Sequence, residues 1–171
     1  MMNDQSVIPA KAMKPEEQSD AIVVSFGPEW HQHLNANSFS VVIRKRVPKS
    51  AAFKWLYFHI NSPVSAICAR APIEKIFSSS LKETVALAKK INLTPAEITS
   101  YFGNDSAIGC YALGNFEIST KPVTTESLAA RLAYHPPQSF FIISSKAKAI
   151  IDEMAAFKVA KSTKTRTRPT R

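Results

Sequence analysis

An apolar, β-branched run leads into three consecutive cations along Ser38–Lys49, and it predicts a β-strand whose side chains alternate between two faces. The face expected to point into the core holds Phe39, Val41 and Ile43. The opposite face holds Ser40, Val42, Arg44 and Arg46. Because a guanidinium group can donate two parallel hydrogen bonds to phosphate oxygens, this strand is a candidate phosphate-binding element. A solvated strand end is the alternative interpretation, since charge blocks alone are weak signals.

Further apolar runs predict most of the remaining fold. Strands are expected at 21–26, 54–60, 64–71 with a continuation at 73–77, 107–119 with a break near Gly114, and 139–144. Helices are expected at about 28–34, 81–90, 95–102, after Thr124 or Thr125, and 146–157. Two of them begin with the pattern of a capping box, Ser80 with Glu83 and Thr94 with Glu97. This order of elements predicts an α+β fold, a mixed β-barrel of about six strands with peripheral helices.

The chain of 171 residues is expected to form one domain at 21–157 between two disordered segments. Residues 1–20 are polar and show no periodicity. Residues 158–171 form a basic tail without an acid, with the cations Lys158, Lys161, Lys164, Arg166, Arg168 and Arg171. The net charge is +9, and without these six cations the rest keeps 16 cations against 13 acids, or +3. The charge therefore predicts an anionic partner that is attracted mainly by the tail.

Other features exclude several classes of function. No apolar run is long enough to span a membrane, and the N-terminus lacks the apolar segment of a secretory signal. Cys68 and Cys110 form no CxxC pair and have apolar neighbours, which predicts buried free thiols in a reducing, cytoplasmic compartment. His31 and His33 are two residues apart on an expected helix and point to different faces, so we expect no metal site. The four glycines are dispersed and no nucleophile has a local signature, so we expect no cofactor and identify no catalytic residue.

The strand at 54–60 offers a second candidate for ligand binding. Its core face is expected to hold Leu56, Phe58 and Ile60. Its other face holds Trp55, Tyr57 and His59, beside Lys54. Aromatic side chains interleaved with cations are typical of platforms for single-stranded nucleic acid. The structural alternative is that helices cover these aromatic rings.

Several short motifs resemble those of ASCH domains, which belong to the PUA-like superfamily. They are Val24–Trp30 (VSFGPEW), Val41–Arg46, Asn61–Ile67, Pro95–Gly103 and Pro136–Phe140, and together they extend over about 22–144. The resemblance implies a small PUA-like β-barrel with peripheral helices and a cleft beside the first helix. It also implies a ligand such as RNA or a modified nucleotide, because domains of this superfamily typically bind these.

The chain departs from the family signature GxKxxExR, which leads into the basic strand. Of that signature only Arg44 is kept, because Asn37, Phe39 and Val42 replace the Gly, Lys and Glu. The similar bacterial acetylcytidine amidohydrolase uses a Lys and a Thr at the positions of Phe39 and Val42, and neither of these residues can exchange a proton. Gly27 stands where the opening motif often has Lys, which weakens an anion pocket.

We therefore predict a domain that binds RNA, or nucleic acid more generally, without catalysis of its own. The expected contacts outside the tail are Arg44, Lys45, Arg46, Lys49, Lys54, Trp30, Trp55 and Tyr57. Two alternatives stay open: a hydrolase of a modified nucleoside or an RNase with relocated catalytic groups, and a regulatory module that binds a protein partner.

Overall fold

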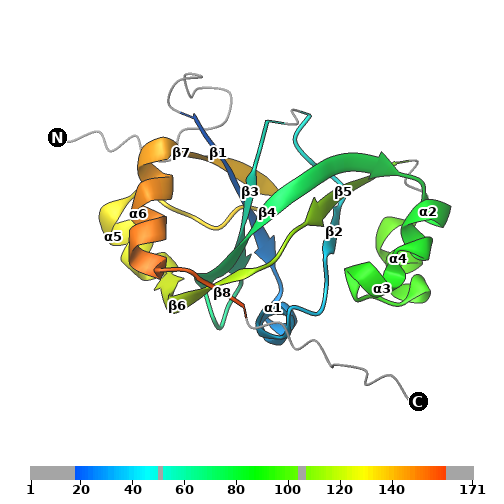
Figure 1. The fold of residues 1–171 in the computed structure, drawn as a ribbon, viewed down its shortest axis with the longest axis horizontal. Coiled ribbons are helices and arrows are strands. Elements are labelled where there is room, and N and C mark those ends of the chain that lie inside the picture. Colours follow the sequence, from blue (N-terminus) through cyan, green and yellow to red (C-terminus); the bar gives the residue numbers. More distant parts are fainter. Residues whose placement is uncertain (1–17, 50–51, 104–106, 161–171) are drawn as a thin grey trace, which may run out of the picture.

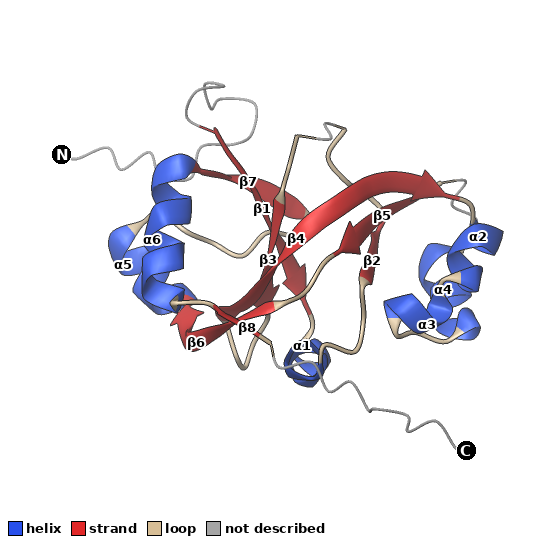
Figure 2. Ribbon diagram, viewed as in Figure 1, coloured by secondary structure: helices blue, strands red, loops and turns tan. Residues whose placement is uncertain are grey.

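The computed structural model describes residues 18–49, 52–103 and 107–160, which form a mixed sheet with helices around it (Figure 1). The strands are β1 (Gln18–Phe26), β2 (Val41–Arg44), β3 (Trp55–Ile60), β4 (Ala66–Ser79), β5 (Ile108–Leu113), β6 (Glu117–Thr124), β7 (Phe140–Ser144) and β8 (Lys158–Val159). The helices are η2 (Pro28–Trp30, a 3-10 turn), α1 (His31–Ala36), α2 (Leu81–Ala86), α3 (Ala88–Ile91), α4 (Pro95–Phe102), α5 (Thr125–Arg131) and α6 (Ser145–Ala155). Helices α5 and α6 cover one side, and α2, α3 and α4 form a separate group beyond β2 and β5 (Figure 2).

The sheet has the strand order β2-β5-β4-β3-β1-β7, and β6 branches from β4 and pairs in turn with β8. Its described pairs are antiparallel except β1 with β3. Strand β4 is long and continues through Pro72, so its first half pairs with β3 and β6 and its second half pairs with β5. No pairing between β2 and β7 is found in the described part of the chain. The predicted α+β class is confirmed, but the sheet has eight strands and is open, so the term barrel applies only loosely.

The interior of the curved sheet holds the largest apolar cluster. Strand β3 contributes Leu56, Phe58 and Ile60, as its alternation predicted, and Phe39 packs against Phe58 and Phe116. The register predicted for β2 is wrong, because Val42 points into this interior. Val41 and Ile43 pack instead against α3 and α4. Phe39 lies before the first residue of β2, so the inward direction of its side chain does not determine which side chains of β2 point inward.

A second apolar cluster lies between the opposite face of the sheet and the helices α5 and α6. Tyr57 is fully buried in it, and Trp55 and Phe157 pack at its margin. His59 is also buried, beside Tyr134. Tyr57 and His59 are therefore covered, so the expectation that they display a stacking platform is wrong, whereas Trp55 is half-buried at the margin of the cluster.

Local sequence signals place the helices. Both predicted capping boxes are confirmed, at Ser80–Glu83 and at Thr94–Glu97. Thr124 caps α5 with its side chain. The single helix predicted at 81–90 is divided at Leu87, whose backbone leaves helical geometry between α2 and α3.

The ends of the described structure differ from the predicted domain limits. Gln18–Asp20 belong to β1, and Lys158 lies in β8 paired with Ile118, so neither belongs to a disordered segment. The remaining predicted disorder, at 1–17 and 161–171, lies outside the described residues. Within the described residues, none of the helices has the length and apolar character needed to cross a bilayer.

Candidate functional site

The segment Lys45–Lys49 leaves the end of β2 and runs between two open clefts. The β4 cleft has a volume of about 970 Å³ and the Trp30 cleft about 680 Å³. Lys45 and Arg46 line both of them, so the basic end of β2 is the shared wall.

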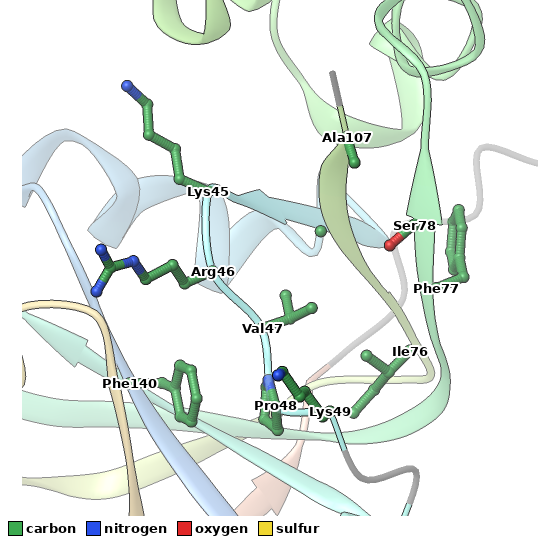
Figure 3. A pocket seen from close by; sticks show the side chains of 11 residues that line it. Lys45, Arg46, Val47, Pro48, Lys49, Ile76, Phe77, Ser78, Ala107 and Phe140 are labelled. Atoms are coloured by element: carbon green, nitrogen blue, oxygen red, sulfur yellow. The ribbon is translucent and has the colours of Figure 1, made fainter. Parts of the chain in front are cut away.

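The β4 cleft is bounded by Lys45–Lys49 on one side and by Ile76–Ser78 of β4 on the other (Figure 3). Its charged lining residues are all cations, namely Lys45, Arg46 and Lys49. Gly109 holds the basic segment against β5, since a Cβ there would lie 2.5 Å from Cγ1 of Val47. Arg46 extends from this segment on the side away from β4.

The Trp30 cleft lies where the ends of β1 and β2 meet η2 and α4. Its lining is Ser25, Phe26, Gly27, Glu29, Trp30, Ile43, Arg44, Lys45, Arg46, Leu93, Glu97, Tyr101, Gln138 and Ser139. Unlike the β4 cleft it contains carboxylates, those of Glu29 and Glu97, opposite in charge to the basic segment. The arrangement suits a ligand with both anionic and hydrogen-bond-donating parts.

Three aromatic residues, Phe26, Trp30 and Tyr101, line this cleft. Trp30 is half-buried, and its ring is held edge-on by Phe26, His33 and Phe39 at centroid distances of 6.2, 5.5 and 5.0 Å. Tyr101 is 50% exposed, and the Lys45 ammonium lies 5.4 Å from the centre of its ring. The sequence patterns did not single out Tyr101 as a site residue, although it lies near the end of α4 in the motif Pro95–Gly103.

Arg44 forms the base of the Trp30 cleft, where it joins β2 to β1. Its Nη1 donates to the carbonyl of Ile43 at 2.8 Å and its Nη2 donates to that of Ser25 at 2.9 Å. The guanidinium also stacks over the Phe26 ring at 4.3 Å. Burial lowers the pKa of Arg44, while Tyr101 and Tyr111 act in the opposite direction. At least two of its five N–H donors are thus used inside the protein.

The remaining predicted contacts lie elsewhere. Trp55 and Tyr57 are on the far face, where Arg70 stacks over Trp55 at 4.3 Å and donates to the Tyr57 hydroxyl. Tyr57 therefore cannot line the cleft beside Trp30. Lys54 is exposed just before β3, and neither it nor Lys158 lines either of these two clefts. The other tail cations lie outside the described residues.

The cysteines and His33, which are candidates for nucleophilic or metal-binding chemistry, lie in surroundings typical of residues with a structural role. Cys68 and Cys110 are buried free thiols as predicted, and burial raises the pKa of both to about 11. His33 lies near Asn92 and Ser38, with its Nδ1 at 3.1 and 3.2 Å from their polar atoms. Within the described residues no group of three potential metal ligands occurs.

Comparison with protein-family models and with curated proteins finds no match for this chain. Solved structures do match it. An ASCH protein from Zymomonas mobilis superposes with a TM-score of 0.73 and 17% identity, over 81% of this chain and 96% of that one. A tyrosine-to-phenylalanine variant of that protein gives 0.71 and 17%, over 82% and 100%. The N-terminal domain of McrB from Staphylothermus marinus gives 0.54 and 10%, over 82% and 97%. At these identities the likeness establishes the fold, and the resemblance to ASCH domains expected from the sequence is confirmed at that level.

Proposed function

Starting from a chain with the fold of ASCH domains, we propose that this protein binds nucleic acid, with RNA as the ligand to test first. One observation carries the proposal: in one short segment, Lys45 and Arg46 line both clefts that meet at the end of β2, and Lys49 lines the β4 cleft. Arg46 and Lys49 are exposed and have no ion pair within the described residues. Exposed cations along an open groove attract the phosphate backbone without regard to base sequence.

The Trp30 cleft would hold a base while the basic segment holds the adjoining phosphates. Trp30 and Tyr101 offer aromatic surface for stacking, which contributes about 1–3 kcal/mol per base in single-strand complexes. The Ser25 hydroxyl supports a ligand here, because it is buried in the wall of this cleft and has no hydrogen-bond partner within the described residues. The tail would add attraction that does not depend on sequence.

Charge reversal in the basic segment tests the proposal. We expect Arg46→Glu to weaken binding of a fluorescein-labelled single-stranded RNA by about tenfold or more, measured by anisotropy, because a charge-assisted contact becomes a repulsion. The matched control is Lys121→Glu, which changes the net charge equally at an exposed position of β6 that lines neither cleft. Equal weakening by both variants would reduce the interaction to net charge alone and contradict the proposed site.

The proposal does not include the amidohydrolase reaction of the similar acetylcytidine enzyme. Phe39 and Val42, which stand at the positions of its Lys and Thr, are buried in the interior cluster and cannot exchange protons. We expect no release of cytidine when the purified protein is incubated with acetylcytidine and followed by chromatography. Release that scales with protein concentration would favour the hydrolase alternative instead.

A further inference from the structure

The carboxylate of Glu29 occupies a place in the Trp30 cleft that exists because residue 27 has no side chain. A Cβ built on Gly27 would lie 2.4 Å from each carboxylate oxygen of Glu29. Glu29 therefore folds back over Gly27, in the same cleft as the rings of Trp30 and Tyr101. Any larger residue at position 27 would force this carboxylate to move.

Of the two carboxylates in the cleft, only that of Glu29 has both oxygens without a hydrogen-bond partner within the described residues. Glu97 caps α4, where its Oε2 accepts hydrogen bonds from the Thr94 backbone N–H at 2.7 Å and from the Thr94 hydroxyl at 3.0 Å. Glu29 is exposed and has neither a hydrogen bond nor an ion pair within the described residues. Its two oxygens can each accept hydrogen bonds and cannot donate any while ionised.

The chemistry of base edges decides which base such a carboxylate would select. Guanine presents two adjacent donors, N1–H and N2–H, in the spacing that a carboxylate accepts from a guanidinium fork. Adenine and cytosine present one amino group beside a ring nitrogen acceptor, and uracil presents one imino group between two carbonyl oxygens. An acceptor-only group placed against those neighbouring acceptors is repelled, so guanine alone satisfies both oxygens.

We propose that the Trp30 cleft recognises guanine, with Glu29 accepting hydrogen bonds from N1–H and N2–H of a base stacked on the aromatic lining. The inference rests on the proposed function, because the base must be delivered by a bound strand. Lys45 and Arg46 line the same cleft and would bind the phosphates of that nucleotide. The cleft thus offers both a carboxylate for the base and cations for the phosphates of a guanine nucleotide.

Inosine provides the test, because it lacks only the N2 amino group of guanosine. Single-stranded RNA decamers of adenosine would carry one central guanosine, inosine, adenosine, cytidine or uridine, and binding would be measured by anisotropy. We expect the guanosine decamer to bind about tenfold more tightly than the inosine decamer, the scale of one hydrogen bond to a charged group. In Glu29→Gln this ratio should fall to about one, because the second acceptor becomes a donor.

Gly27→Ala gives an independent variant that keeps the carboxylate and displaces it, and it should lower the same ratio. Glu126→Gln, at an exposed position of α5, is the control and should keep the ratio. If all decamers bind and guanosine is not preferred to inosine, the inference is wrong and the proposed function stands. If no decamer binds, the proposed function itself fails. A Glu29→Gln protein with a lower melting temperature and an unchanged ratio would show that Glu29 only stabilises the start of η2, and would overturn the inference.

Discussion

Arg44 connects two strands that do not pair with each other. Its guanidinium donates to the carbonyls of Ser25 and Ile43, near the ends of β1 and β2, and covers Phe26, so it fixes the position of the wall from which Trp30 and the basic segment extend. The sequence predicted a phosphate ligand at this position. In the structure, Arg44 holds the base of the cleft in place. Contact between a ligand and its remaining N–H donors stays a prediction.

Truncation of Arg44 tests this structural role. We expect Arg44→Ala to lower the free energy of unfolding by about 1.5–3 kcal/mol, because two carbonyls lose a charged donor. Binding of RNA should weaken as well, since the cleft loses its base. Urea unfolding of the variant gives the first quantity, and Arg46→Ala is the control, expected within about 0.5 kcal/mol of the parent as an exposed substitution. A stability equal to the parent would show that these hydrogen bonds contribute nothing.

His59 makes stability depend on pH. Burial lowers its pKa to about 4, and its Nδ1 lies 2.9 Å from the Tyr134 hydroxyl while its Nε2 is buried without a partner within the described residues. An unfolded chain protonates histidine near pH 6.5. Above that value the imidazole is neutral in both states, and between about 6.5 and 4 only the unfolded state gains the proton, so acid favours unfolding.

We therefore expect His59 to lower the free energy of unfolding by about 1.4 kcal/mol for each pH unit between 6.5 and 4. Denaturant titrations at several pH values measure this slope. His59→Phe should remove that contribution, whereas His135→Gln, at an exposed position, should keep it. An identical slope in parent and His59→Phe would show that another group is responsible.

At the scale of elements, α6 is joined to the sheet by one polar network. Asp152 accepts hydrogen bonds from the Tyr57 hydroxyl at 2.5 Å and lies 3.1 Å from Nη1 of Arg70. Arg70 also pairs with Glu117 of β6. Desolvation and the Asp152 hydrogen bond raise the pKa of Tyr57. The network explains why the aromatic face of β3 is covered.

Removal of the Asp152 carboxylate tests this connection. Asp152→Ala should lower the free energy of unfolding by about 1–3 kcal/mol, because a buried hydroxyl and a guanidinium lose a partner. The matched control is Lys148→Ala, which removes only the i,i+4 pair with Asp152, worth about 0.3–0.5 kcal/mol. Similar losses in urea unfolding for the two variants would contradict the network.

The elements differ in how far the sequence predicts them. Capping boxes and the strict alternation of β3 depend on local spacing, so Ser80, Thr94 and Phe58 were placed correctly. Both faces of β2 and β3 are covered, however, and alternation alone cannot distinguish an interior cluster from one beneath helices. That is why Val41 was assigned to the wrong side, and why Tyr57, on the side predicted for it, was expected to be open to a ligand although it is buried.

At the scale of the whole molecule, we predict that the basic tail increases the salt dependence of nucleic-acid binding. Deletion of residues 161–171 should flatten the log–log dependence of affinity on salt by about 0.7 per lost contact on single strands and about 0.9 on duplex. Preference among sequences should barely change. Titrations at several salt concentrations measure the slope, and equal slopes for the truncated and full-length proteins would exclude the tail as an electrostatic arm.

The candidate site itself was only partly predictable. Arg44 and the cations after it are neighbours in the chain, and Trp30 belongs to one of the motifs that resemble those of ASCH domains. The sequence alone could therefore group these residues in one candidate site. Tyr101 and Glu97 reach the same cleft from α4, and Glu29 does so only because Gly27 makes room. These placements follow from tertiary packing, which spacing along the chain does not encode.

The most direct measurement of the central claim uses the two tryptophans, which lie on opposite faces of the sheet. Trp30 lines the candidate cleft, and Trp55 is stacked beneath Arg70 on the far face. With Trp55→Phe the emission of Trp30 alone is followed while single-stranded RNA is added, and Trp30→Phe provides the converse protein. We predict saturable quenching of Trp30 at the concentrations at which anisotropy reports binding, and a nearly constant emission from Trp55. Binding of RNA with no change at Trp30, or with the change confined to Trp55, would contradict the account.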